Sequence, residues 1–281
     1  MYRLLGVLIV LTFIAGCTAN IGYKFADTLV EWKVKDYVDL NDKQEELLSK
    51  KVDEMHQWHA QTQLPLYRKE LKSLRDKVEQ KSLTQQDISD FESRLWDFWG
   101  NVLTQVEAEA DLLTTLTLTQ REQLIRRLEE AQEERYQRLE EDKKESDILR
   151  RLDRITEVEE DLEDILGDLT TEQDKLLRSW VSESPELREQ WLSYRASWLT
   201  EFEKALMSRP IDEKRLSSLI LDPRQLRNED FQQNSEQSSE LRKEFLWDMY
   251  QSLNPEQRKK VIKKADEYID LLDSLINDFS D

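Results

Sequence analysis

A five-residue word recurs four times along the chain and constrains the fold more than any other feature. It reads LNDKQ at 40–44, LTLTQ at 116–120, LTTEQ at 169–173 and LNPEQ at 253–257. In each copy a Thr or Asn is followed three residues later by Gln. This spacing is typical of a capping box, in which the first side chain accepts from the N3 backbone amide and the Gln side chain accepts from the N-cap amide. Each word therefore predicts the start of an α-helix.

Each word predicts an N-cap residue and an N3 residue, and the words are unevenly spaced along the chain. The predicted N-cap and N3 residues are, in chain order, Asn41 and Gln44, Thr117 and Gln120, Thr170 and Gln173, and Asn254 and Gln257. Thr84 and Asp87 form a weaker fifth case. Because the intervals between copies differ, the chain is not expected to be a solenoid of equal repeats.

Composition indicates what lies between these helix starts. The chain has five glycines and five prolines in 281 residues, and 36% of its residues are charged. A sheet protein of this length needs many more turn residues. We therefore predict an all-α fold, an elongated bundle of about eight to ten helices.

Apolar periodicity and stop signals place the individual helices. The expected ranges are 23–38, 42–61, a third helix that continues through Tyr67 to about 80, 85–113, 118–166, 171–182, a helix opened by Ser184 and Pro185 and ended by Arg209 and Pro210, a short piece capped by Asp212, 236–252 and 255–279. Leu64 and Pro65 are expected to break the second helix. The helix 118–166 is either continuous or kinked near 145–147, and the stretch 222–239 is expected to be a linker.

The first 17 residues, MYRLLGVLIVLTFIAGC, contain one cation before an apolar run and end at the only cysteine. The run has the length of a secretory signal and is too short for a transmembrane helix. Its end resembles a bacterial lipobox, in which the cysteine is lipidated and becomes the first residue. We therefore expect a signal peptide at 1–16, a lipidated Cys17 with a short tether at 17–22, and a helical domain at 23–281 with its best internal boundary near 167. The alternative is an ordinary signal peptide with an incidental cysteine.

The lipobox resemblance also implies a location. In lipoproteins of bacteria with two membranes, Asp after the cysteine usually retains the protein at the inner membrane, whereas this chain has Thr18 there. The resemblance thus implies the outer membrane, with the protein on its periplasmic face and the membrane as a partner through the N-terminal lipid. The five residues between Cys17 and Tyr23 reach about 17 Å, which keeps the helices close to the bilayer.

Charge and cysteine content exclude several classes of function. The formal net charge of −19 argues against nucleic acid as a partner, since phosphates are bound by Lys and Arg. A lipidated Cys17 leaves no thiol for disulfides, thiol catalysis or cysteine-ligated metal. We find no motif that implies a cofactor, and acidic pairs such as Glu159 and Glu160 are expected to be solvated helix faces.

The two histidines are the only side chains that suggest a metal or proton site. His56 and His59 are three residues apart on a predicted helix, so they can face the same way. Two histidines supply half of a zinc site, and no His-Glu-x-x-His pattern is present. The favoured interpretation is that His59 packs or hydrogen-bonds in a helix junction with Trp58 and Tyr67, and that no residue is catalytic.

Tryptophans occur in pairs at helical spacing. We expect Trp96 with Trp99, and Trp191 with Trp198, to lie in the core. Any exposed member would indicate a groove for a partner.

One stretch resembles a known family. The resemblance is carried by Asp36, Tyr37, Val38, Asp39, Leu40 and Gln44, then by His56, Trp58, His59, Thr62, Leu64, Pro65 and Tyr67, and by 169–173 after Gly167. These residues resemble the signature of a proteobacterial lipoprotein family known only as a domain of unknown function. The resemblance implies class and location but no activity. The capping words also resemble, more weakly, those of the periplasmic Spy and CpxP stress proteins.

Three functions are consistent with these observations. The favoured one is a lipid-anchored helical interaction or scaffold protein of the bacterial envelope with an unidentified protein partner. The second is a chaperone-like or envelope-stress protein that binds unfolded clients. The third is a metal-dependent enzyme that uses His56 and His59.

Overall fold

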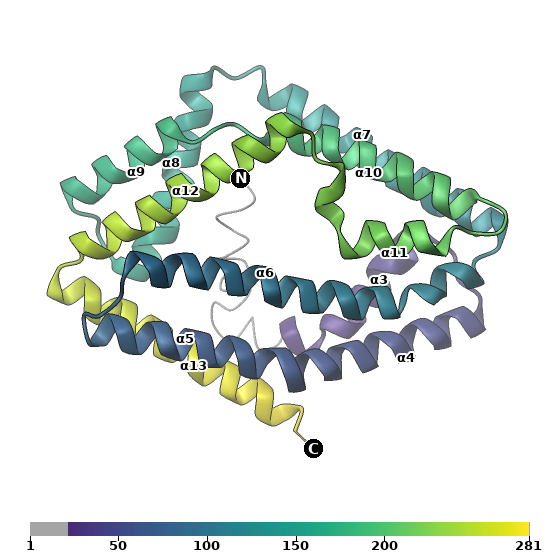
Figure 1. The fold of residues 1–281 in the computed structure, drawn as a ribbon, viewed down its shortest axis with the longest axis horizontal. Helices are drawn as coiled ribbons and strands as arrows, with labels where there is room; N and C mark the ends of the chain where they lie inside the picture. Colours follow the sequence, from purple (N-terminus) through teal and green to yellow (C-terminus); the bar gives the residue numbers. More distant parts are fainter. Residues whose placement is uncertain (1–21, 281) are drawn as a thin grey trace.

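The computed structural model describes residues 22–280, and all regular structure in that range is helical (Figure 1). The all-α prediction is confirmed. The described part of the chain contains eleven α-helices, numbered as in Figure 1: α3 Ala26–Tyr37, α4 Asp42–Trp58, α5 Leu64–Glu79, α6 Gln85–Ala108, α7 Leu118–Asp142, α8 Asp147–Leu166, α9 Thr171–Glu183, α10 Arg188–Met207, α11 Glu213–Leu221, α12 Glu229–Ser252 and α13 Pro255–Asp278. A π-turn, η1 (His59–Gln63), and two 3-10 turns, η2 (Ala110–Thr115) and η3 (Pro223–Leu226), complete the elements. The predicted signal peptide and Cys17 lie outside the described residues.

The helices, arranged as in Figure 1, pack in groups. Each group has its own apolar core. The first core joins α8, α9 and α12, where Trp180 stacks on Phe245 with ring centroids 4.8 Å apart. The second joins α7, α10 and α11 around Leu206, and the third joins η1 and α5 to α13 around Leu64 and Leu272. Helix α6 crosses between the groups and contacts α11 and α12. Because α13 packs on both α5 and α8, the two sides of Gly167 share interfaces.

Each repeated word starts a helix, and each forms a capping box with both hydrogen bonds present. The Thr84–Asp87 start does the same at α6. In every word the Thr or Asn side chain accepts from the backbone amide of the Gln, and the Gln Oε1 accepts from the cap amide. The first four backbone amides of a helix have no hydrogen-bond partner within that helix. Because a capping box satisfies two amides at the helix start, it fixes where the helix begins.

The four words also meet in two pairs. At the first junction, between the starts of α4 and α7, the side-chain amides of Gln44 and Gln120 donate to each other at 3.1 and 2.7 Å. Each Nε2 also donates to the backbone carbonyl two residues before the partner's cap: Gln44 to Thr115 at 3.0 Å, and Gln120 to Asp39 at 2.7 Å. The words therefore join helices as well as starting them.

The second junction, between the starts of α9 and α13, repeats this arrangement. Gln173 and Gln257 donate to each other at 3.0 and 2.9 Å. Gln173 also donates to the Ser252 carbonyl at 3.5 Å and to its hydroxyl at 3.0 Å, while Gln257 donates to the Asp168 carbonyl at 3.2 Å. Gln173 is fully buried and Gln257 is 4% exposed. Two helix starts distant in sequence are thus fixed together through their caps.

The expected break at Pro65 is wrong, because the helical path continues through the π-turn η1 into α5. Proline removes one backbone donor and its ring crowds the carbonyl four residues earlier. The wider π-turn accommodates this without ending the helix. The rod of α4, η1 and α5 therefore continues past the proline (Figure 1).

The expected helix start at Ser184 is also wrong. Ser184 is the C-cap of α9, where its hydroxyl donates to the Trp180 carbonyl at 2.7 Å, and the three residues that follow it are not helical. Helix α10 begins at Arg188. The long helix predicted over 118–166 is divided in two, and Ser146 caps the second part by accepting from the Leu149 amide at 3.3 Å.

The stretch 222–239 is not a linker. It forms η3 and the first part of α12, which begins after the cap residue Asn228. The Asn228 side chain accepts from the Phe231 amide at 2.8 Å, and Phe231 is 1% exposed. The short helix expected after Asp212 is α11, and Asp212 caps it by accepting from the Arg215 amide at 3.0 Å. The division of 118–166 into α7 and α8 accounts for the one helix beyond the ten ranges expected.

No helix within residues 22–280 combines the length and the apolar character that crossing a bilayer requires.

Candidate functional site

The histidine pair lies where α4 passes into the π-turn, at a junction of four chain segments. His59 is held by two tyrosines: the Tyr23 hydroxyl is 2.8 Å from Nδ1, and the Tyr67 hydroxyl is 3.3 Å from Nε2. A neutral imidazole has one donor and one acceptor nitrogen, so it satisfies both hydroxyls at once. His59 therefore acts as a hydrogen-bonding bridge between the segment before α3 and helix α5.

Burial controls the protonation of this group. Desolvation, with a smaller contribution from the neighbouring His56, lowers the pKa of His59 to about 4. Burial raises the pKa of Tyr67 to about 12, and burial together with Tyr67 raises the pKa of Tyr23. The three groups are consequently all neutral at pH 7.

His56 packs between the two ends of the described chain. Its ring centroid is 4.8 Å from that of Tyr23 and 4.7 Å from that of Phe279. Its Nδ1 lies 3.8 Å from a carboxylate oxygen of Asp27, and its buried Nε2 has no hydrogen-bond partner among residues 22–280. The ring thus joins α3, α4 and the end of α13.

This cluster lacks the ligands of a metal site. Within the described residues, no group of three or more His, Cys, Asp or Glu side chains is placed to hold a metal ion. Both nitrogens of His59 are occupied by tyrosines. The arrangement supports packing of the helix junction, in which Tyr67 also contacts Phe98 of α6 with centroids 4.9 Å apart.

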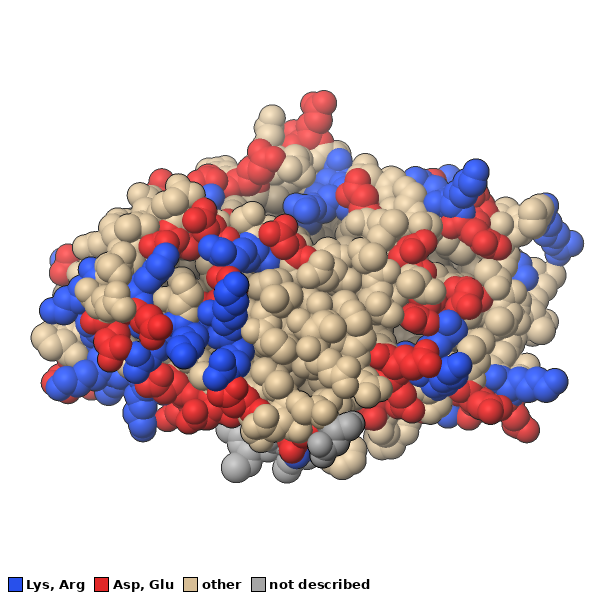
Figure 2. Space-filling model, turned by 60° about the horizontal axis from the view of Figure 1, so that its bottom comes forward, with Lys and Arg blue, Asp and Glu red and all other residues tan. Residues whose placement is uncertain are grey.

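A neutral face surrounds this junction on the outside. The thirteen residues 55–67 contain no Asp, Glu, Lys or Arg, although 36% of the chain is charged. We call the solvent-facing side of this segment the neutral face; its exposed residues are Gln57, Gln61, Thr62 and Leu66. Figure 2 shows a broad area without charged side chains across the middle of the molecule, where α4 passes into α5, with charged regions at both ends. The side chain of Leu66 is 38% exposed.

Of the tryptophans expected in the core, Trp191 and Trp198 are half-buried against aromatic neighbours, and the expectation is wrong for Trp96 and Trp99. Trp198 stacks on Phe202 at 5.0 Å and donates from Nε1 to the Leu219 carbonyl at 3.2 Å, and Trp191 contacts Phe231 edge-on at 4.7 Å. Trp96 and Trp99 are 42% and 49% exposed. The Arg224 guanidinium lies 4.5 Å over the Trp96 ring, which covers part of it. Helical periodicity could not tell these pairs apart, because both follow an apolar stripe.

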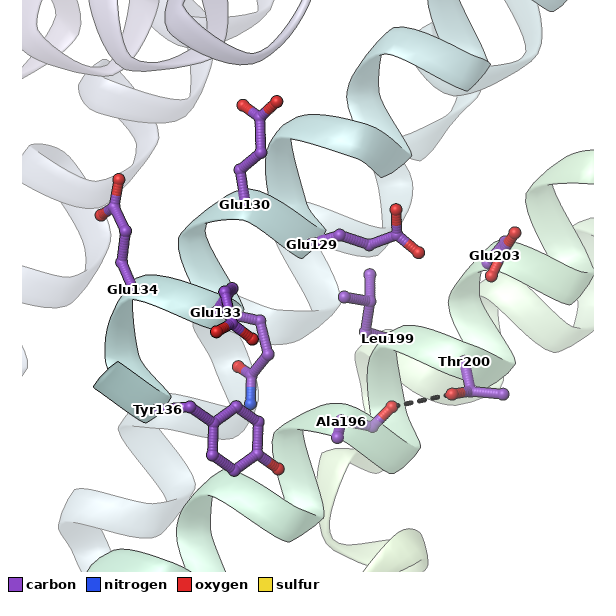
Figure 3. Close-up of a pocket in the computed structure, with 10 residues that line it drawn as sticks. Glu129, Glu130, Glu133, Glu134, Tyr136, Ala196, Leu199, Thr200 and Glu203 are labelled. Atoms are coloured by element: carbon purple, nitrogen blue, oxygen red, sulfur yellow. Dashed lines mark hydrogen bonds between the residues drawn. The ribbon is translucent and has the colours of Figure 1, made fainter. Parts of the chain in front are cut away.

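A groove of about 700 Å³ lies between α7 and α10 (Figure 3). Its apolar lining comes from Tyr136, Ala196 and Leu199. Its carboxylates are Glu129, Glu130, Glu133, Glu134 and Glu203. The Thr200 hydroxyl donates to the Ala196 carbonyl at 3.0 Å, and the Gln132 side-chain amide donates to the Leu192 carbonyl at 3.1 Å. The lining carries negative charge and no histidine. In the sequence its acids resemble an ordinary solvated helix face, so no pattern there indicates a groove.

The fold and these features define an all-α protein with an acidic surface, a neutral face over one helix junction and paired glutamine helix starts. The chain belongs to the Family of unknown function (DUF6279), whose sequence profile matches residues 36–232. The matched range contains the neutral face and three of the four capping words, and it ends before Gln257. No curated protein and no solved structure matched the chain.

Proposed function

We propose that the protein is a lipid-anchored interaction protein of the bacterial envelope, held at the outer membrane with its helices in the periplasm. The lipid anchor is inferred from the N-terminal segment up to Cys17, and the choice of the outer membrane is inferred from Thr18. Several acyl chains on one cysteine give a stable attachment where a single chain does not. The partner is a protein bound through the neutral face.

The neutral face is the observation that carries the proposed interaction. Protein interfaces are depleted in charged residues at their centre, so a segment without charges in a highly charged chain is a candidate binding surface. The segment 55–67 combines this property with a rigid base, because the helix behind it is fixed by the His59 bridge and by α13. Leu66 offers an apolar contact, and the side-chain oxygen of Gln61 can accept from a partner while its amide group donates to the Phe279 carbonyl at 3.0 Å.

Site-specific photo-crosslinking in intact cells tests the interaction. A photoreactive residue at Leu66 is expected to give one or a few discrete adducts in the envelope. The matched control is Ile148, an apolar residue that is 71% exposed at the start of α8, a helix that packs on α9 and α13 rather than on α4 or α5. Equal adduct patterns at the two positions would contradict the proposal. A smear of many adducts at Leu66 alone would instead support binding of unfolded clients.

The anchor is tested separately. Cys17→Ser is expected to remove the protein from the outer membrane fraction, because a serine hydroxyl cannot take the lipid that the cysteine thiol would carry. Fractionation of the serine variant with the outer membrane, as for the unaltered chain, would refute lipid anchoring.

A further inference from the structure

Helix α3, the first described helix, presents an apolar stripe to solvent. Phe25, Leu29 and Trp32 are 58%, 52% and 64% exposed. Their spacing of four and three residues places them on one side of the helix. These are among the most exposed large apolar side chains of the described residues, and together they form a continuous ridge.

The opposite side of α3 is fixed to the body of the protein. Helix α3 packs on α4 and α7. Tyr23 bonds His59, and Asp27 lies 3.8 Å from His56. The body therefore holds α3 in an orientation that keeps the stripe outward.

The charge of α3 differs from that of the rest of the chain. Between residues 22 and 37, three lysines balance three acids, whereas the whole chain carries −19. The stripe ends at an exposed ion pair between Lys33 and Asp36, 3.4 Å apart. This segment is consequently not repelled by anionic lipid headgroups as the acidic remainder is.

The position of α3 in the chain selects its partner. Only five residues separate Cys17 from Tyr23, a reach of about 17 Å. A twelve-residue helix is about 18 Å long and cannot span a hydrocarbon core of about 30 Å. A helix with one apolar side at this distance from a lipid anchor can lie in the plane of the headgroups, with its apolar side chains buried roughly 5–10 Å deep.

We propose that α3 lies on the bilayer that carries the Cys17 lipid, with Phe25, Leu29 and Trp32 inserted among the headgroups. The inference rests on the lipid anchor of the proposed function and adds a second point of membrane contact. Two linked contacts fix the direction in which the body stands from the membrane, whereas a lipid on a short tether alone does not.

The test uses the acylated full-length protein in vesicles of phosphatidylethanolamine and phosphatidylglycerol. Lipidation consumes the only cysteine, so a new cysteine is the only free thiol. Leu29→Cys and Val30→Cys are labelled with a nitroxide, and its collision rates with oxygen and with a neutral nickel chelate are measured. Val30 is the matched control because it is adjacent, apolar and 47% exposed, yet turned about 100° around the helix from Leu29.

We expect the oxygen-to-nickel accessibility ratio at position 29 to be about threefold that at position 30 or more, as an inserted side chain requires. Equal, water-like ratios on protein that floats with the vesicles would overturn the inference and leave the anchor standing. Shielding of position 29 from both reagents would also overturn it, because protein and not lipid would then cover the stripe. Protein that does not float would overturn the anchor and this inference together.

Discussion

The side-chain amides of Gln173 and Gln257 donate to each other across a distance of 84 residues in sequence, at 3.0 and 2.9 Å, while each also closes its own capping box. Gln44 and Gln120 do the same at the first junction. A capping box needs only an acceptor at N3, and Glu serves as well as Gln. The junctions also need a donor, which only the amide supplies. The fifth start has Asp87 at N3, and it pairs with Lys77 rather than with another helix start.

Gln173→Glu separates the two roles of this residue. The variant keeps the capping acceptor but loses the donor to Gln257 and Ser252, and it places a carboxylate at a fully buried position. We expect a loss of about 2–4 kcal/mol in the free energy of unfolding. Urea denaturation at pH 7 measures it.

Thr170→Ala is the control, because it removes the cap hydroxyl of the same helix and leaves the glutamine pair in place. It is expected to cost about 1 kcal/mol. If Gln173→Glu costs no more than this, the pairing adds nothing to stability. A cycle of Gln173→Ala and Gln257→Ala should also be non-additive, since the two amides contact each other.

The helix starts could be predicted from the sequence because a capping box is local: four residues contain the whole signal. The pairing of Gln44 with Gln120 could not, because it depends on where helices meet in space. The π-turn at His59–Gln63 was missed for a related reason, since Pro65 is compatible with either a break or a wider turn. Tertiary contacts of this segment with Tyr23 and α13 stabilise the helix that continues through the π-turn.

The stretch 222–239 is polar overall but contains one buried aromatic residue, Phe231. Phe231→Ala tests how much this residue contributes to stability. Phe231 is 1% exposed, contacts Trp191 edge-on, and lies under the Arg227 guanidinium at 4.9 Å. Truncation of a buried Phe costs about 3–5 kcal/mol through lost burial and the cavity that remains. The exposed neighbour Gln233 is the control, and Gln233→Ala should change the urea midpoint little. Similar midpoints for the two variants would mean that this part of α12 is not core.

Gly167 ends α8 in a backbone conformation that other residues avoid, with φ of 73° and ψ of −164°. We expect Gly167→Ala to destabilise the protein by about 1–3 kcal/mol. A new Cβ would also meet the end of the Lys260 side chain, which can move away. Lys260→Ala should therefore not rescue the variant, and rescue would show that crowding rather than φ is the cause.

Gly100 provides the matched comparison for Gly167. It lies within α6, and a Cβ there would meet nothing within 4 Å. Gly100→Ala should raise stability by about 1 kcal/mol, because Ala is the better helix former. Opposite signs for the same substitution, measured by thermal unfolding, are the expected outcome.

His59 should make stability depend on pH in a defined window. The pKa of His59 is about 4 in the folded protein, whereas a histidine that is not buried has a pKa of 6.5. Above pH 6.5 both states hold a neutral ring, so this group has no effect. Between pH 6.5 and 4 the unfolded chain binds a proton that the folded chain does not, and stability falls as the pH falls. The full loss is roughly 3 kcal/mol and is reached below pH 4.

His59→Gln removes this titration while keeping a side chain that can donate to one tyrosine and accept from the other. The carboxylates titrate in both proteins, so the difference between their unfolding free energies isolates His59. At pH 7 the variant should be the less stable, since its amide fits the site of a ring imperfectly. On acidification the difference in the free energy of unfolding between the two proteins should narrow by up to about 3 kcal/mol, because only the unaltered protein loses the histidine contribution. A difference that stays constant between pH 7 and pH 4 would show that the ring is protonated as easily in the folded protein as in the unfolded chain, and burial would then not hold it neutral.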